Sequence, residues 1–375
     1  MIYLDYSATT PVNEEVLDSF VKACKKYPGN PNSLHKLGVE ANHLIDMATK
    51  QIEELLDIND YEIIYTSGSS EANNLALKGV ADKYKNRGKH IITTKLEHSS
   101  IYGPLNYLID KGYEVSYVNL DNNGHIDLEH LQRLIRDDTI LVTINAVNSE
   151  LGILQPIDKI GQLLKKYPKC YFHVDLTQVI GKVRIPLNNI DLASFSAHKF
   201  YGLKGIGALI KKKKTVIEPL IHGGKSTTIY RSGTPSLPLI ISFAKALRLA
   251  HIDIDNKYKY VQELSDDLRA FLTKYDKVKI NSPIDSIPHI LNISIIGVKP
   301  ESMLHALELY DVFISTQSAC ATANSISKAV YSITNNQELA KSSIRISLSY
   351  LTTKEEVCMF KEIFDKCYKE LTCLR

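Results

Sequence analysis

The sequence lacks the features that would place it in a membrane or in a secreted form. No apolar run approaches the ~20 residues that a membrane span needs. The start of the chain, residues 1–6, has neither the basic region nor the hydrophobic core of a signal peptide. Internal repeats and low-complexity tracts are also absent. We therefore expect a globular protein of the cytoplasm with no membrane partner.

The sequence also has no large excess of positive or negative charge. The 45 lysines and arginines and the 42 aspartates and glutamates leave a formal net charge of only +3. A charge this small and this evenly spread gives no support for direct binding of nucleic acid. The densest basic run, Lys211–Lys214, is predicted to be a solvated turn between two strands, with a binding patch as the alternative.

Cysteine is scarce, and none of the six cysteines forms a Cys-x-x-Cys pair with another. The sequence therefore has no zinc pattern and no disulfide framework, and we expect no metal site. Cys170 leads an apolar run and is predicted to lie in the core, whereas the cysteines from Cys358 onward follow a helical pattern. Cys320 differs because its neighbours, residues 315–327, are small and polar. They predict a mobile loop, with a buried structural thiol as the alternative.

Short β-rich runs alternate with helical patterns over the first two thirds of the chain. With 375 residues and 44% hydrophobic content, the chain can bury a large core divided between two or three domains. The alternation predicts an α/β fold with a mostly parallel sheet and helices on both faces, so ligands should gather at the carboxyl ends of the strands. The expected strands are 62–65, 90–94, 115–118, 140–144, 171–174, 192–194 and 208–210, and the expected helices between them include 71–84, 128–135 and 157–167.

A long helical pattern over 242–270 separates this region from the C-terminal part, with a boundary near residue 255. Short strands at 290–295 and 343–348 and two further helices then predict a smaller α+β domain. We expect this domain to fold back over the mouth of the larger one. The predicted division is 15–255 for the large domain, and 1–14 with 256–375 for the small domain.

A lysine, Lys199, directly follows His198 between an apolar run and a glycine-rich stretch. In a partly dry site the pKa of a lysine falls, and its neutral amine becomes a nucleophile toward an aldehyde. Pyridoxal phosphate is the commonest such aldehyde in enzymes. A surface lysine at a strand-to-loop junction is the alternative.

Three strand ends supply further candidates for a pyridoxal phosphate site. The expected strand 62–65 leads into a turn with Ser69 and Ser70 that opens a helix, which suits a phosphate, although a serine N-cap is the alternative. Asp175 ends another apolar run and could pair with the pyridinium nitrogen of the cofactor, although a helix cap would also explain it. His98 follows a strand and could stack on the ring, although single histidines at strand ends are more often structural.

These motifs, in this order, make the chain resemble the cysteine desulfurases, which are class-V aminotransferases of the fold-type-I pyridoxal phosphate enzymes. The resemblance covers essentially the whole chain. The matching stretches are Tyr3–Pro11, Gly29–Ser33, Thr66–Ala76, Glu97–His98, Val147–Glu150, His173–Gln178, Ser194–Gly202, Arg231–Thr234, Ser318–Cys320 and Ser343–Ser347.

The resemblance assigns a role to each candidate. It implies that Lys199 is the Schiff-base residue, that Asp175 is the pyridinium partner and that His98 stacks on the ring. Gln178 would contact the ring hydroxyl, and Asn148 would lie beside the ring and the substrate. The phosphate would be held by Ser69, Ser70, Ser196 and His198, with Thr234 from a second subunit, which implies a homodimer.

Arg345 and Cys320 would then act on the substrate, L-cysteine. The planar guanidinium of Arg345 suits the substrate carboxylate, although an exposed strand arginine is the alternative. The family implies that Cys320 attacks the substrate sulfur and leaves as a persulfide, with L-alanine as the other product. The acceptor of this sulfur would be an iron–sulfur scaffold protein or a tRNA thiolation enzyme.

The sequence also departs from the family pattern. Ser70 replaces a threonine, Gln317 replaces the glycine before Ser-Ala-Cys, and 321–328 lacks the usual Leu-Glu-Pro-Ser run. Residues 223–230 replace a glycine-rich stretch, which puts the contacts near Thr234 in doubt. Alternatives are a selenocysteine lyase, another lyase or aminotransferase of the same fold, and a partner-binding scaffold without catalysis. The Ser-Ala-Cys motif argues against plain aminotransfer, which needs no thiol.

Overall fold

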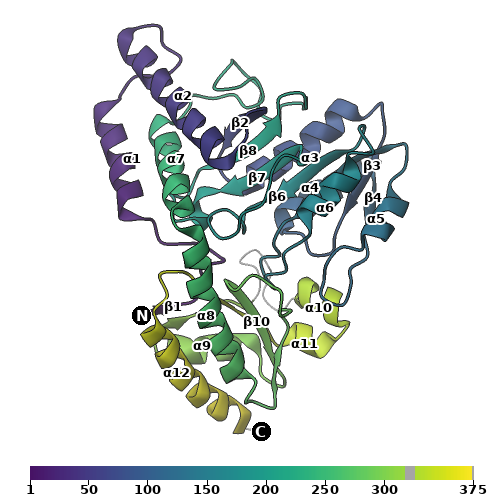
Figure 1. The fold of residues 1–375 in the computed structure, drawn as a ribbon, viewed down its shortest axis with the longest axis vertical. Helices are drawn as coiled ribbons and strands as arrows, with labels where there is room; N and C mark the ends of the chain where they lie inside the picture. The colour runs from purple at the N-terminus through teal and green to yellow at the C-terminus, as the bar shows by residue number, and fades with distance from the viewer. Residues whose placement is uncertain (317–325, 374–375) are drawn as a thin grey trace.

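A seven-stranded sheet forms the centre of the larger part of the molecule (Figure 1). The computed structural model describes residues 1–316 and 326–373. The strand order is β2-β8-β7-β6-β5-β3-β4, and β8 alone runs antiparallel to its neighbours. The strands are β2 (Tyr61–Thr66), β3 (His90–Thr93), β4 (Glu114–Tyr117), β5 (Thr139–Asn145), β6 (Tyr171–Asp175), β7 (Leu192–Ser196) and β8 (Gly207–Lys212).

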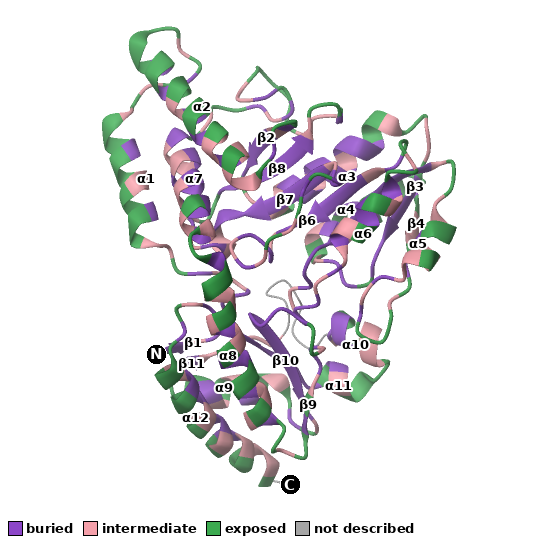
Figure 2. Ribbon diagram, in the orientation of Figure 1, coloured by how far each residue is buried: buried purple, intermediate pink, exposed green. Residues whose placement is uncertain are grey.

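Helices cover both faces of this sheet, which confirms the predicted fold class. Every residue of β5 is buried, as expected of a parallel strand that is covered on both sides. Figure 2 shows the same contrast between buried strands and helices with exposed outer faces. The helices of this part are α1 (Glu14–Lys26), α2 (Lys36–Leu56), α3 (Ser69–Tyr84), α4 (Ser99–Asp110), α5 (Leu128–Leu134), α6 (Ile157–Leu164) and α7 (Leu237–His251).

The smaller part has a separate core and includes both ends of the described chain (Figure 1). Its antiparallel sheet has the order β12-β10-β9, while β1 pairs in parallel with β11. The N-terminal strand therefore packs with elements from the last third of the chain. The elements are β1 (Ile2–Tyr3), α8 (Ile254–Leu272), β9 (Val278–Ile280), β10 (Ile290–Ile295), α9 (Pro300–Glu308), β11 (Val312–Phe313), α10 (Lys328–Thr334), α11 (Gln337–Lys341), β12 (Ser343–Ser347) and α12 (Lys354–Cys373).

The single long helix predicted over 242–270 is wrong, because the structure has two helices there. Helix α7 ends at His251 and α8 begins at Ile254. Between them Asp253 adopts a left-handed conformation with a φ of 56°. Aspartate tolerates this conformation better than most residues. The apolar period continues across the break, and the sequence pattern therefore did not reveal it.

The lysine run 211–214 is only partly the solvated turn that the sequence predicts. Lys213 and Lys214 lie in a turn, whereas Lys211 and Lys212 belong to β8. The Lys211 side chain is fully buried, and its Nζ lies 2.7 Å from Glu62 Oε2 on β2. The same Nζ lies 4.3 Å from the centre of the Tyr230 ring. The prediction failed because strand residues alternate between faces, and a run of identical residues hides this alternation.

The cysteine predictions that the structure can test are confirmed. Cys170 is buried, and Cys358, Cys367 and Cys373 lie on α12. Within residues 1–316 and 326–373, no helix is long and apolar enough to cross a membrane. The same residues contain no cluster of three or more histidines, cysteines, aspartates or glutamates that could hold a metal ion.

Replacing Glu62 by Gln should destabilise the fold, because it leaves the Lys211 ammonium buried without a counter-charge. Removing one partner of a fully buried pair costs about 3–5 kcal/mol, and we expect about 1–3 kcal/mol here because the Glu62 side chain is 32% exposed. Urea unfolding measures this loss. Glu263→Gln, which breaks an exposed pair with Lys354, is the matched control and should change stability by less than about 1 kcal/mol. Equal stability of the two variants would contradict the expectation.

Candidate active site

The turn after β2 leads into a helix whose first amide groups have no side-chain cap. This helix, α3, begins at Ser69 after Gly68. The serine N-cap that the sequence left open is therefore not formed. A Cβ at Gly207 on the neighbouring β8 would lie 2.8 Å from Gly68 Cα, so glycine is needed for this close approach. The uncapped amides and their dipole suit a phosphate.

A cavity of about 240 Å³ opens beside this helix end and at the carboxyl ends of the parallel strands. It brings together eight of the residues singled out from the sequence, together with residues near the N-terminus, at the end of β5 and next to Gln178. The lining residues are Ser7, Ala8, Ser69, Ser70, His98, Asn145, Val147, Ser149, Asp175, Thr177, Gln178, His198, Lys199 and Arg345.

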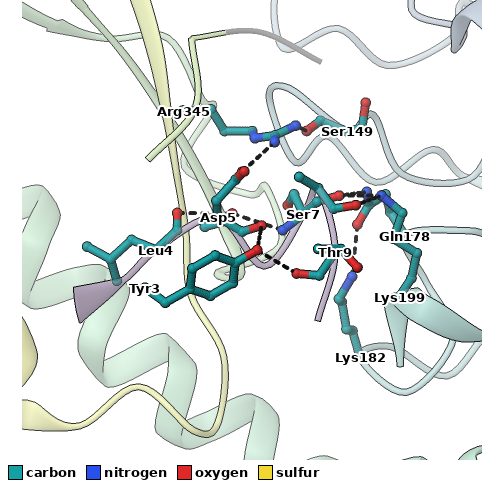
Figure 3. Close-up of polar contacts among 12 residues, drawn as sticks. Tyr3, Leu4, Asp5, Ser7, Thr9, Ser149, Gln178, Lys182, Lys199 and Arg345 are labelled. Atoms are coloured by element: carbon teal, nitrogen blue, oxygen red, sulfur yellow. Dashed lines mark hydrogen bonds and ion pairs between the residues drawn. The ribbon is translucent and has the colours of Figure 1, made fainter. Parts of the chain in front are cut away.

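Lys199 lies at the end of a short 3₁₀ helix, η1 (Ala197–Lys199), that follows β7. Its Nζ donates hydrogen bonds to the backbone oxygens of Ser7, at 2.5 Å, and Ala8, at 2.8 Å. Figure 3 shows the amine pointing to this N-terminal segment. The sequence did not reveal this role of Ser7 and Ala8, because backbone carbonyls leave no signal in residue type.

Asp175 is buried at the end of β6 and has two kinds of partner. Its Oδ1 accepts from the backbone N–H of Thr177 at 2.9 Å, which is the local cap that the sequence allowed. Its Oδ2 accepts from Asn73 Nδ2 on α3 at 2.8 Å. No ion pair joins Asp175 to a lysine or arginine in the described parts of the chain. A cationic ring nitrogen would suit this carboxylate.

His98 is the N-cap of α4, and hydrogen bonds fix its ring. Its Nδ1 accepts from the backbone N–H of Ser100 at 3.2 Å and lies 2.8 Å from the Ser100 hydroxyl. Burial lowers the pKa of His98, and the ring is neutral near pH 7. The hydrogen then lies on Nε2. Asn73 also donates to Ser100 Oγ, at 2.9 Å, and so connects His98 with Asp175.

Arg345 is buried rather than exposed, which removes the alternative of a surface arginine. Arg345 lies on β12, is 1% exposed and lines the cavity. Nη2 lies 2.8 Å from Asp5 Oδ1, and Nη1 donates to the backbone oxygen of Ser149 at 2.9 Å. Figure 3 shows the guanidinium between these two partners. A buried, oriented guanidinium of this kind can bind a carboxylate with two hydrogen bonds.

Four of the expected site residues do not line this cavity. Asn148 donates to Leu96 O at 2.8 Å and accepts from the backbone amides of residues 150 and 151, while its neighbours Val147 and Ser149 line the cavity. Ser196 is buried behind the turn. Thr234 is exposed and lines a separate cavity of about 160 Å³. Cys320 lies outside the described residues.

Glu97 precedes His98 and is fully enclosed beside the cavity. It accepts from Thr94 Oγ1 at 2.6 Å and from the backbone N–H of Asn145 at 3.1 Å. Burial raises the pKa of Glu97 to about 8, with a smaller contribution from the charge of Asp175. The carboxyl group is therefore mainly protonated at neutral pH. A neutral Glu97 leaves Asp175 as the negative group at this end of the cavity.

Comparison with known proteins finds related proteins along the whole chain. The family model for class-V aminotransferases matches residues 2–360. A cysteine desulfurase of Dictyoglomus turgidum, named IscS, is 38% identical over 99% of this chain and 95% of its own length. The mitochondrial cysteine desulfurase of Saccharomyces cerevisiae is 40% identical over 95% of this chain and 72% of its own length.

Two solved structures resemble this chain over nearly its whole length. One NifS-like protein superposes with a TM-score of 0.92 at 34% identity and covers 99% of both chains. A NifS-like protein of Rickettsia africae superposes with a TM-score of 0.88 at 33% identity, over 98% of this chain and 99% of that one.

The protonated state of Glu97 should make the folded protein less stable as the pH rises. The folded state keeps this proton up to about pH 8, whereas the unfolded chain loses it near its ordinary pKa of 4.5. Between these values the folded state binds more protons, so the contribution of Glu97 to the free energy of unfolding falls with rising pH.

Glu97→Gln should remove this fall. Urea unfolding at several pH values should show slopes that differ between the variant and the unmodified protein by up to about 1.4 kcal/mol per pH unit. Glu129→Gln, at an exposed position, is the control. Parallel stability curves for Glu97→Gln and the unmodified protein would mean that Glu97 is ionised in the fold.

Proposed function

The chain belongs to the class-V aminotransferase family and is a pyridoxal phosphate-dependent cysteine desulfurase, and we propose that its reaction takes place in the cavity lined by Lys199, Asp175 and Arg345. The observation that carries this placement is the meeting of an amine, a buried carboxylate and a buried guanidinium in one cavity. These three groups match the aldehyde and ring nitrogen of the cofactor and the carboxylate of an amino acid.

The side chains around the cavity fit pyridoxal phosphate. The uncapped start of α3 offers free amide groups to a phosphate, and the Ser69 and Ser70 hydroxyls lie beside them. Asp175 has no lysine or arginine partner among the described residues, and a protonated ring nitrogen would supply a positive one. The neutral, fixed ring of His98 offers a flat surface for stacking.

We therefore assign the cofactor contacts as the family pattern implies. When bound, pyridoxal phosphate would supply an aldehyde for the amino group of L-cysteine and a ring that takes up electrons from the α-carbon. The residues proposed to hold its phosphate are Ser69, Ser70, Ser196 and His198, with Thr234 from a second copy of the chain. Those proposed to hold its ring are His98, Asn148, Asp175 and Gln178.

Lys199, Asp175 and Arg345 each have a separate role in this proposed reaction. Lys199 Nζ takes the proton from the substrate α-carbon, and the backbone oxygens of Ser7 and Ala8 stabilise the resulting ammonium. Asp175 would hold the proton on the ring nitrogen of the bound cofactor. Arg345 binds the substrate carboxylate and orients the amino acid, with Asp5 holding the guanidinium in place.

The sulfur transfer itself is proposed to take place at Cys320. Its thiolate attacks the substrate sulfur, so that the bond between this sulfur and the β-carbon breaks and a sulfur–sulfur bond forms. The electron pair stays on the carbon fragment, which takes up protons and leaves as L-alanine. Cysteine and the Cys320 thiol together contain the same atoms as alanine and the persulfide, so this step needs no outside oxidant or reductant.

The partners and location follow the same proposal. We propose a homodimer, because Thr234 lies on the surface of one copy and away from that copy's own cavity. An iron–sulfur scaffold protein or a tRNA thiolation enzyme would receive the sulfur, and the cytoplasm would be the site of action.

Two substitutions separate cofactor binding from sulfur transfer. Lys199→Ala should abolish the visible absorbance of pyridoxal phosphate bound covalently to the protein. All turnover should be lost with it. Cys320→Ala should keep this absorbance and lose the formation of alanine from cysteine. The assay contains purified protein, pyridoxal phosphate, cysteine and a reductant, and it measures sulfide and alanine. Loss of the absorbance in Cys320→Ala would contradict the assignment, and pyruvate as product would indicate elimination instead.

Arg345→Lys tests the proposed carboxylate site. Lysine keeps the positive charge but loses the planar fork of donors. We expect the KM for cysteine to rise about tenfold to a hundredfold, as the loss of a hydrogen bond to a charged group implies. The affinity for free L-alanine, measured by titration of the visible absorbance, should fall in parallel. An unchanged KM together with an unchanged alanine affinity would place the substrate carboxylate elsewhere.

A further inference from the structure

We propose that Lys182 is a positioning residue that fixes the amide of Gln178 with one of its N–H groups facing the ring oxygen of the cofactor. This inference rests on the proposed function, because it concerns the expected contact of Gln178. Lys182 lies four residues after Gln178, in the turn that follows β6. Its residue is 8% exposed, and its Nζ donates to Gln178 Oε1 at 2.8 Å (Figure 3).

Two partners give the Gln178 amide the same orientation. Gln178 Nε2 donates to the backbone oxygen of Ser7 at 2.9 Å, and a carbonyl oxygen can only accept. Lys182 Nζ donates to the oxygen at the other end of this amide. The oxygen of the amide is therefore held at Lys182 and the nitrogen at Ser7. The nitrogen has a second hydrogen, and Gln178 lines the cavity.

The surroundings of Lys182 argue against a purely structural role. No carboxylate forms an ion pair with Lys182 in the part of the chain that the structure describes. Burial, with smaller contributions from the nearby charges of Lys199 and Arg345, lowers the pKa of Lys182 to about 7. A buried amine beside two cations is costly to the fold. The hydrogen bond that Lys182 donates to Gln178 provides a functional reason for burying this amine.

Gly181, directly before Lys182, fixes the position of the backbone in this turn. Gly181 has a φ of 74°, and a Cβ there would lie 2.8 Å from Ala250 Cβ on α7. The turn therefore packs tightly against α7 at the residue before Lys182. The amine reaches its partner from a fixed backbone, as positioning requires.

A fixed donor at the ring oxygen should have a spectroscopic signature. Such a donor stabilises the deprotonated oxygen, and the proton shared by this oxygen and the Lys199 nitrogen is then lost at a lower pH. Removing the donor should raise the pH midpoint at which the visible absorbance of the bound cofactor changes. It should also weaken cofactor binding.

The test is a double-mutant cycle on the protein loaded with pyridoxal phosphate, with Lys182→Met, Gln178→Ala and the double variant. Each single change should raise the absorbance midpoint by about one pH unit and weaken pyridoxal phosphate binding about tenfold. The double variant should shift by clearly less than the sum of the two single shifts, because the part of the Lys182 effect that passes through Gln178 is already lost in Gln178→Ala. Arg184→Met removes an exposed cation two residues further along and is the matched control, with no shift expected.

Other outcomes would overturn the inference. Shifts that add in the double variant would mean that the Lys182 charge acts directly on Lys199, because a direct effect persists when Gln178 is absent. A midpoint equal to that of Arg184→Met would mean no role at all. If Lys182→Met does not fold, Lys182→Gln replaces it in the same cycle. Failure of the unmodified protein to bind pyridoxal phosphate or to form alanine would overturn the proposed function, and this inference with it.

Discussion

The site depends on the path of one short segment, residues 3–10, which runs between the two parts of the molecule. On one side Asp5 holds Arg345, and the backbone N–H of Ser7 donates to Ser347 Oγ at 2.9 Å. On the other side the carbonyls of Ser7 and Ala8 accept from Lys199 and Gln178. Groups from the large sheet and from the small domain are therefore fixed against a common backbone. Their relative positions follow from this segment as much as from either core.

Positive charge is concentrated around the same segment. Lys182, Lys199 and Arg345 lie close enough to influence one another electrostatically, and burial lowers the pKa of His198 to about 4. A cavity with this balance favours ligands with anionic groups, such as a phosphate and an amino-acid carboxylate. The protonated Glu97 and the buried Asp175 limit the negative charge to the place where a cationic ring nitrogen would lie.

The sequence predicted the parts of this structure that depend on side-chain pattern. The parallel strands appeared as apolar runs because both faces are covered, and Lys199, Asp175 and His98 appeared because each follows such a run. The contacts of Ser7, Ala8 and Ser149 could not be predicted, since they use backbone oxygens that every residue has. Asn73 was visible only as part of a motif, and its link between Asp175 and His98 depends on how α3 packs against α4. Lys211 was hidden because a run of identical lysines does not show the alternation of a strand, and Asp253 was hidden because the apolar pattern continues where the backbone breaks.

The pairing of β1 with β11 has a consequence for the order in which the protein becomes complete during synthesis. The seven strands of the large sheet all lie between residues 61 and 212, whereas Ile2 pairs with Val312, about 310 residues later. Synthesis proceeds from the N-terminus, so strand β1 can pair with β11 only after residues 312–313 have been made. The segment that follows β1 includes Ser7 and Ala8, whose carbonyls accept from Lys199. Completion of the site therefore depends on a pairing between residues made early and residues made late.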